Sequence, residues 1–284
     1  MKQVTNIKPF TCACTAMLAV LLCVVVALGV PVCSYAAGSS TDSASQASKS
    51  APSSTTTPAK ASAKKKKVKT GIHKVGKNYY FYNKKGKRKK KEVIRDGKWT
   101  YYATKKGAIE ARKKGKKYYY NNGKRMTSAD TKDYKAYLAA KKMVKKLTKE
   151  SDSKAKKRLK CFKWLMKQPT IIHRSWSYSR EAWPAVYAMD HFKKIGGDCQ
   201  SYGAAFAYMA AYIGYKKTYV CTDSKTAPGG GHSWAMIGDA VFDAMFAAEG
   251  SFHTYYNSTH GTYEVNPTTR TKLPMFNPKH AKKK

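Results

Sequence analysis

The sequence predicts an α+β fold, in which a run of β-hairpins precedes a domain that combines helices with a strand hairpin. Three observations carry this prediction. Gly-Lys pairs followed by aromatic runs occur three times within residues 71–126, a pattern typical of hairpins. Residues 199–213 are apolar on nearly every face, as in a buried helix. Gly238-Asp239 then joins two strand-like apolar runs, as a two-residue hairpin loop does.

Charge divides the 284-residue chain into regions. Lys and Arg number 56 and Asp and Glu 16, a formal net charge of +40. Residues 60–167 carry most of the excess, whereas residues 168–250 carry seven basic and seven acidic side chains. A single uniformly basic domain is therefore excluded, and the basic part requires a polyanionic partner such as nucleic acid, membrane or an anionic wall polymer.

The N-terminus predicts export. Lys2 and Lys8 precede an apolar run over residues 13–32, and the small residues around Ala36 suit signal peptidase. Residues 1–36 are interpreted as a cleaved signal peptide, and the chain as secreted to the cell wall or cell surface. An uncleaved anchor stays open, because the run is long enough to span a bilayer, and a membrane is a partner only in that case. Export disfavours nucleic acid as the partner.

Residues 37–70 are predicted to be a disordered linker. They are rich in Ser, Thr, Ala and Pro and include a lysine run at 64–67. Such a composition buries too little apolar surface to offset the entropy of the chain.

Residues 71–126 contain three related units. Gly76-Lys77, Gly97-Lys98 and Gly115-Lys116 each precede an aromatic run. Hairpins this short need to stack on their neighbours to bury aromatic side chains. The units resemble the choline- and glucan-binding repeats of Gram-positive surface proteins. With Trp99 as their one tryptophan and with many lysines, they imply contacts with anionic wall polymers or peptidoglycan rather than a choline cage. A solvated basic spacer without a ligand stays open.

Helices are predicted next. Between residues 130 and 169, apolar residues recur at spacings of three to five with lysines between them. This indicates two amphipathic helices, separated near residues 151–153 and closed by Pro169. The two helices are expected to pack on the domain that follows, with a position on a membrane surface as the alternative. Residues 183–194 have the spacing of a third helix.

Cys199 is the first candidate catalytic residue. Gly196-Gly197 marks a tight turn, Asp198 suits the cap of a helix and Gly214 suits its end, so Cys199 falls at the first helical position. There the helix dipole and free amides stabilise a thiolate and a developing oxyanion. Three cysteines remain after the signal, an odd number that favours a thiol kept for chemistry. A buried, inert cysteine stays open, and no spacing suggests a metal site.

His232 and Asp243 follow on the predicted strand hairpin. With Gly238-Asp239 as its loop, Ile237 pairs with Ala240, which puts His232 and Asp243 on one face as diagonal neighbours. A slip of one residue would put them on opposite faces. A thiol with an imidazole and a carboxylate arranged in this way is the set needed for nucleophilic acyl transfer.

Three motifs occur in order in this region. Gly-Gly-Asp-Cys-x-Ser-Tyr precedes an Ala-rich helix, His-x-Trp follows, and an Asp lies eleven residues after the His. They resemble the transglutaminase-like superfamily over residues 130–250. The resemblance implies a papain-like core within residues 130–284, with the nucleophile helix packed on an antiparallel sheet. It also implies Cys199 as nucleophile, His232 as base and Asp243 as third member, with neither cofactor nor metal.

The implied reaction is attack on the amide of a Gln side chain or peptide bond. A thioester would form and would be resolved by a primary amine or by water, so the substrate would be a protein or peptide with Gln or amide groups. Trp176, Tyr202 and Trp234 are candidates to line the cleft or support the oxyanion, with core packing as the alternative for each. For the whole chain, the alternative is a non-catalytic surface adhesion or scaffold protein held to anionic wall polymers.

Overall fold

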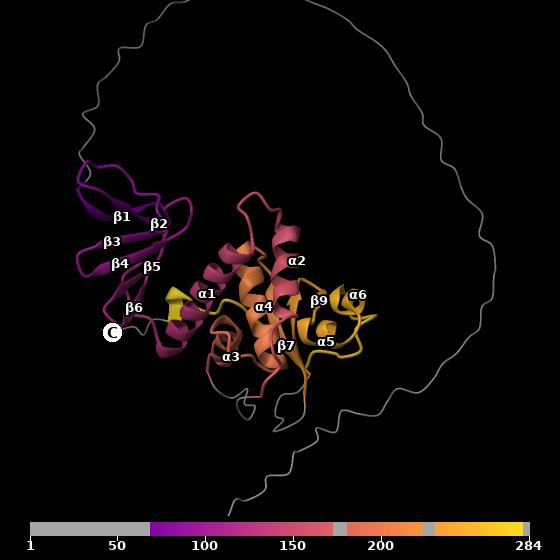
Figure 1. The fold of residues 1–284 in the computed structure, drawn as a ribbon. Coiled ribbons are helices and arrows are strands. Elements are labelled where there is room, and N and C mark those ends of the chain that lie inside the picture. Colours follow the sequence, from indigo (N-terminus) through magenta and orange to yellow (C-terminus); the bar gives the residue numbers. More distant parts are fainter. Residues whose placement is uncertain (1–68, 173–180, 224–230, 281–284) are drawn as a thin grey trace, which may run out of the picture. The chain divides into compact units, whose positions relative to one another are not determined.

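The computed structural model describes residues 69–172, 181–223 and 231–280 (Figure 1). The predicted signal peptide, residues 37–68 of the predicted linker and Trp176 lie outside these residues. Within them, no helix is long and apolar enough to cross a membrane. They form a mixed α+β structure with antiparallel sheets, so the predicted fold class is confirmed at this level.

Short strands form three consecutive hairpins at the start of the described chain. They are β1 (Gly71–Val75), β2 (Asn78–Tyr82), β3 (Val93–Asp96), β4 (Trp99–Ala103), β5 (Ile109–Lys114) and β6 (Lys117–Tyr120). β1 and β2 form one sheet, and β3 to β6 form a four-stranded antiparallel sheet. Each Gly-Lys pair is the loop of a hairpin, and Gly76, Gly97 and Gly115 have φ angles of 58°, 53° and 57°. Glycine suits this left-handed conformation because it has no Cβ.

The hairpins have two small apolar cores. One joins β2 to the four-stranded sheet and consists of Phe81, Ile94, Tyr101, Ala103 and Ile109. The other lies between β5–β6 and the first helix, α1 (Ser128–Leu147), and consists of Ala111, Tyr118, Tyr120, Met126 and Tyr134. Because Tyr134 belongs to α1, the last hairpin packs directly on the helix that follows it.

The longer helices are α1, α2 (Lys154–Leu165), α3 (Trp183–Phe192) and α4 (Cys199–Ile213). The side chains of Thr127, Ser153 and Asp198 cap α1, α2 and α4 by accepting a hydrogen bond from a backbone N–H three residues on. The predicted helices are therefore confirmed, including the break before Ser153. α2 ends at Leu165, and backbone turns lead from there towards Pro169.

α4 is the central element of the mixed domain (Figure 1). It packs against α1, α2 and α3 and also against two strands of an antiparallel sheet, β7 (Thr218–Thr222) and β8 (Ser233–Ile237). The sheet has the order β10-β9-β8-β7-β11, completed by β9 (Ala240–Phe242), β10 (Tyr256–Ser258) and β11 (Thr269–Lys272). Two short helices, α5 (Ala244–Glu249) and α6 (Phe252–Tyr255), connect β9 to β10. Contacts around the whole of α4 explain why its sequence lacks a polar face.

The residues after β11 return to α1. The carboxylate of Asp133, which is fully buried in α1, accepts hydrogen bonds from the backbone N–H groups of Met275 and Phe276 at 2.9 and 2.7 Å. It also accepts one from the hydroxyl of Tyr208 in α4. One carboxylate thus joins three segments that are far apart in sequence.

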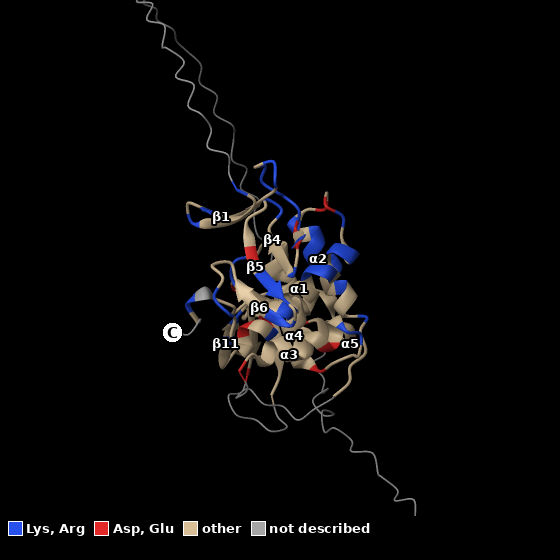
Figure 2. Cartoon of the chain, turned by 90° about the vertical axis from the view of Figure 1, so that its left-hand side faces the viewer, with Lys and Arg blue, Asp and Glu red and all other residues tan. Residues whose placement is uncertain are grey.

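Basic side chains are unevenly distributed over these elements. Figure 2 shows lysines and arginines crowded on the hairpins and α2, whereas α3 and α4 carry few. The neutral part of the sequence is therefore the part that forms the centre of the mixed domain.

Candidate active site

Cys199 is the first residue of α4, and its position is set by the glycines before it. A Cβ on Gly197 would lie 2.3 Å from the Cβ of Ser201, and one on Gly196 would lie 2.7 Å from the carbonyl oxygen of Pro169. The turn is held to the Pro169 segment by hydrogen bonds, since Gly197 N–H donates to the Pro169 carbonyl at 3.1 Å. Any side chain at either glycine would force this turn apart and displace Cys199.

The start of α4 provides the environment predicted for a reactive thiol. Asp198 caps the helix by accepting a hydrogen bond from the Ser201 N–H at 3.1 Å. Cys199 is partly exposed, and its own amide lies in the first turn, where N–H groups have no partner within the helix. These amides and the positive end of the helix dipole face charge that develops at the sulfur or at an attacked carbonyl.

The hairpin that carries the other two residues has the predicted register. Ile237 pairs with Ala240, Met236 with Val241, and the loop residue Gly238 has a φ of 63°. The ladder ends at the pair Ala235 and Phe242, and His232 and Asp243 flank β8 and β9 beyond it. The Nε2 atom of His232 forms a hydrogen bond with Oδ2 of Asp243, as the register predicts.

Asp243 is held by more hydrogen bonds than the sequence indicates. Its side chain is 1% exposed, and Oδ2 also accepts a hydrogen bond from the Tyr263 hydroxyl at 2.8 Å. Oδ1 accepts from the backbone N–H groups of Met245 and Phe246, both at 3.1 Å, because Asp243 is the N-cap of α5. Four donors therefore fix the carboxylate in one orientation towards His232.

His232 lies between this carboxylate and Cys199. Burial alone lowers its pKa, but the hydrogen bond and charge of Asp243, followed by those of Cys199, raise the pKa to about 10. Because Nε2 contacts Asp243, Nδ1 is the nitrogen left for the thiol. The ring of Phe246 stacks on the imidazole with centroids 4.0 Å apart and planes 10° apart, which restricts its rotation. The arrangement favours an imidazolium beside the Cys199 side chain.

The other two cysteines of the described residues have a different environment. Cys161 and Cys221 are fully buried, and burial raises the pKa of each thiol to about 12. Within the described residues, none of the three cysteines forms a disulfide. Cys199 is thus the thiol that both solvent and His232 can reach.

The proposed cleft residues occupy different positions. Tyr202 is buried, and its hydroxyl donates to the carbonyl of Gln168 at 2.5 Å, so it holds the segment beside the Gly197 turn. Trp234 is fully buried in β8, and its indole N–H has no hydrogen-bond partner among the described residues. Trp176 lies outside the described residues.

Sequence reasoning did not find three residues that contact the triad. Tyr263 and Phe246 are described above, and Asp223 accepts a hydrogen bond from the backbone N–H of His232 at 2.6 Å. An Asp directly before an apolar run is a possible helix cap, and this signal could have placed Phe246 close to Asp243. Tyr263 lies in a segment without strand or helix periodicity, so no local signal indicates its contact with Asp243.

Comparison with protein-family models, with curated protein sequences and with solved structures found no match to this chain. Within the described ranges, no three His, Cys, Asp or Glu side chains are grouped so that they could hold a metal ion.

Proposed function

We propose that this chain is an exported, cell-wall-associated cysteine enzyme of transglutaminase-like type, acting on Gln side chains or peptide amides through a thioester. One observation carries the proposal: the Asp243 carboxylate binds the His232 imidazole, and the imidazole interacts with the thiol of Cys199 at the start of a helix. This is the order of groups that activates a nucleophile for acyl transfer.

The proposed reaction has two steps. The Cys199 thiolate attacks the amide carbon, and the first-turn amides of α4 stabilise the oxyanion. The His232 imidazolium gives its proton to the leaving nitrogen, which departs as ammonia or an amine and leaves a thioester. Neutral His232 then takes a proton from an incoming amine or water, which attacks the thioester and releases the thiol.

The fold supports assignment of a papain-like core to the mixed domain. A buried helix carries the cysteine at its first residue and packs on an antiparallel sheet, whose adjacent strands position the histidine and aspartate. This is the layout that the motif resemblance implies.

The hairpins support attachment to the wall by charge. Several aromatic faces are already covered by cations of the chain itself. Arg88 lies 4.5 Å from the ring centroid of Tyr80, Lys114 lies 5.5 Å from Trp99, and Arg112 lies 5.6 Å from Tyr79. A choline ligand would have to displace these cations, whereas an anionic polymer would contact them directly.

A peptide library incubated with the full chain, with and without a primary amine, tests the enzymatic proposal. Mass spectrometry distinguishes amine incorporation, deamidation, peptide cleavage and inactivity. We expect one of the first three, abolished in Cys199→Ala and retained in Cys221→Ala. Inactivity of the folded wild-type chain on Gln and peptide amides would instead favour the non-catalytic scaffold.

Iodoacetamide provides a check that does not depend on knowing the substrate. At neutral pH it should label Cys199 much faster than Cys161 and Cys221, because burial keeps the latter two thiols protonated and shielded. Equal labelling of the three in the native protein would remove the argument for an activated thiolate.

A further inference from the structure

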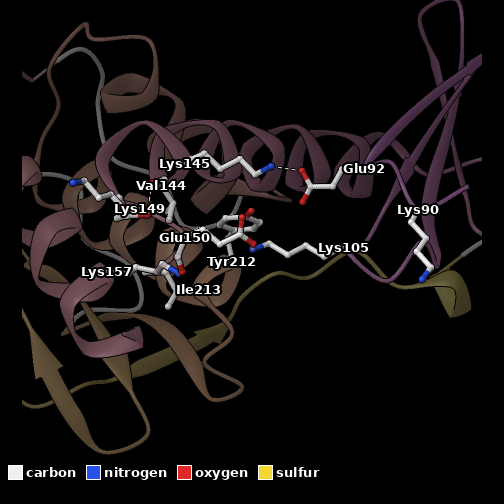
Figure 3. Close-up of a pocket in the computed structure, with 11 residues that line it drawn as sticks. Lys90, Glu92, Lys105, Val144, Lys145, Lys149, Glu150, Lys157, Tyr212 and Ile213 are labelled. Atoms are coloured by element: carbon white, nitrogen blue, oxygen red, sulfur yellow. Dashed lines mark hydrogen bonds and ion pairs between the residues drawn. The ribbon is translucent and has the colours of Figure 1, made fainter. Parts of the chain in front are cut away.

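A cavity of about 580 Å³ lies where the hairpins meet α1, α2 and α4 (Figure 3). It contains none of the triad residues. It is lined by Lys90, Glu92, Lys105, Val144, Lys145, Thr148, Lys149, Glu150, Lys157, Tyr212 and Ile213. Its volume is in the range of sites that hold a small molecule or one section of a polymer.

The lining has an excess of positive charge. Five lysines face two glutamates, which leaves three cations without a matching carboxylate. Glu92 pairs with Lys145, and Glu150 pairs with Lys105, so each glutamate ties the hairpins to the helices. Figure 3 shows Lys105 and Lys157 directed towards Glu150, and Lys145 directed towards Glu92, whereas Lys90 and Lys149 lie at opposite ends of the lining with their side chains turned outward.

The remaining lysines come from both sides of the cavity. Among the described residues, no carboxylate lies within ion-pair distance of Lys90, Lys149 or Lys157. Lys90 precedes β3, whereas Lys149 and Lys157 belong to the α1–α2 loop and to α2. Lys157 donates to the backbone carbonyl of Glu150 at 3.0 Å, which directs its ammonium group along the loop.

The loop that carries Lys149 is ordered by its own hydrogen bonds. The Lys149 N–H donates to Asp152 at 2.9 Å, and Lys160 donates to the same carboxylate at 2.7 Å. The hydrogen bond from Lys160 lowers the pKa of Asp152 to about 2, so this carboxylate stays charged and the loop keeps its shape. The backbone that carries Lys149 and Glu150 beside the cavity is thus fixed.

The cavity combines three kinds of contact. Lysine ammonium groups donate to phosphate oxygens, and glutamate carboxylates accept from hydroxyl groups. The ring of Tyr212, at the end of α4, supplies an apolar face of the kind that packs against the C–H groups of a polyol or sugar. The three lysines without a carboxylate partner favour an anionic ligand over a neutral one, and the Tyr212 ring favours a ligand that also carries C–H groups.

We propose that this cavity binds a phosphorylated polyol or sugar. Lys157 contacts the phosphate together with Lys149, whose exposed side chain turns inward when the ligand binds, Glu150 accepts hydroxyl groups, and Lys90 contacts a second phosphate where the ligand is a polymer. The site is separate from the triad and does not rest on catalytic activity. A ligand that spans it would join the hairpins to the mixed domain in the same place as the two ion pairs.

Calorimetric titration of the full chain tests the proposal with glycerol 3-phosphate, inorganic phosphate, glycerol and a short glycerol phosphate oligomer as probes. The test variant is Lys149→Gln with Lys157→Gln. The matched control is Lys142→Gln with Lys146→Gln, which removes the same charge from exposed positions of α1 that do not line the cavity. Melting temperatures check that all variants are folded.

We expect the test variant to bind the phosphorylated probes about tenfold or more weakly, and the control to stay within about twofold of wild type. Glu150→Gln should retain phosphate binding but reduce the preference for glycerol 3-phosphate over inorganic phosphate. Binding of the oligomer alone, lost in the test variant, would identify a polymer as the ligand. Binding of the monomer with equal affinity per site would identify a free phosphorylated metabolite.

Two outcomes would overturn the proposal. Equal weakening in the test and control variants would mean that the probes respond to the overall basic charge. Absence of binding of every phosphorylated probe to the wild-type chain would mean that the lysines serve only the contacts within the protein.

Discussion

At the scale of single residues, the candidate site depends on how Asp243 is held. A buried carboxylate with four hydrogen bonds cannot rotate away from His232, and it supplies the charge that offsets the burial of the imidazole. The raised pKa of His232 is thus caused mainly by its carboxylate partner between β9 and α5, which outweighs the effect of burial.

Asp243→Asn should lower the pKa of His232 from about 10 by several units. The variant loses the carboxylate charge that raises this pKa, so the lowering effect of burial dominates. In wild type, a histidine whose pKa is raised from 6.5 stabilises the fold fully below pH 6.5, and this contribution is lost as the pH rises to 10. Nuclear magnetic resonance titration of the imidazole and melting temperatures across this range measure both effects. The variant should lose less stability than wild type as the pH rises towards 10. Its amide turnover should fall by about 10²- to 10⁴-fold. An unchanged imidazole titration in the variant would contradict this account.

Tyr263 is a positioning residue if the proposed chemistry is correct. Tyr263→Phe removes the hydroxyl that donates to Asp243, a hydrogen bond to a charged group that contributes about 1.5–3 kcal/mol. We expect kcat to fall about tenfold or more with KM little changed, and the pKa of His232 to rise because the carboxylate loses a competing donor. Tyr255→Phe is the matched control, since that ring packs against Tyr263 but its hydroxyl has no hydrogen bond among the described residues. Identical pH profiles for Tyr263→Phe and wild type would leave the residue a purely structural role.

At the scale of elements, the contact between α4 and β8 sets the distance between nucleophile and base. A Cβ on Gly203 would lie 2.9 Å from the carbonyl carbon and 3.0 Å from the Cα of Trp234, both of which are backbone atoms that cannot move aside singly. The absence of a side chain at one position of α4 therefore allows the helix to lie directly on the strand that follows His232.

Gly203→Ala should push α4 away from β8. We expect a loss of stability of about 1–3 kcal/mol from overpacking, although alanine favours a helix by about 1 kcal/mol over glycine. Amide turnover should fall by a larger factor than the loss of stability accounts for, because Cys199 moves with the helix. Denaturant unfolding and amide turnover measure the two effects. Gly261→Ala, where the nearest atom to the added Cβ is 3.7 Å away, should be close to wild type in both; an equal effect at the two sites would refute the packing argument.

Elements with local signals could be predicted from the sequence, and those set by distant partners could not. The glycine turn and Asp198 define the start of α4, and Gly238 defines the register of β8 and β9. By contrast, β10 and β11 are short, partly polar strands that are recognisable only once their neighbours are in place. The contact between Tyr263 and Asp243 could not be predicted for the same reason. The neighbouring sheet positions the Tyr263 side chain, and the sequence around it has no periodic pattern.

At the scale of the whole molecule, the excess basic charge and the candidate active site lie in different parts of the chain. The basic side chains cover the hairpins and α2, and the triad lies in the part of the sequence with balanced charge (Figure 2). Under the proposed function, attachment and catalysis respond to different conditions, since salt screens the first much more than the second.

Sedimentation of the full chain with purified cell walls should therefore be strong at 0.1 M salt and largely lost at about 1 M, as the Debye length falls from about 10 to 3 Å. Choline chloride should act no differently from sodium chloride at the same ionic strength, because cations of the chain already cover the aromatic faces. Release of the protein by low concentrations of choline at constant ionic strength would instead indicate an aromatic cage.

The carboxylate of Asp133 has a consequence for how the chain reaches its final state. Its acceptor sites on α1 are filled by backbone amides 142 and 143 residues further along the chain. If the chain is exported N-terminus first, as the proposed function implies, α1 emerges well before Met275 and Phe276. The Asp133 carboxylate then stays hydrated until these donors arrive, because burying it without them is costly. Under the proposed export, the core around α1 is therefore completed only after residues 275–276 have crossed the membrane.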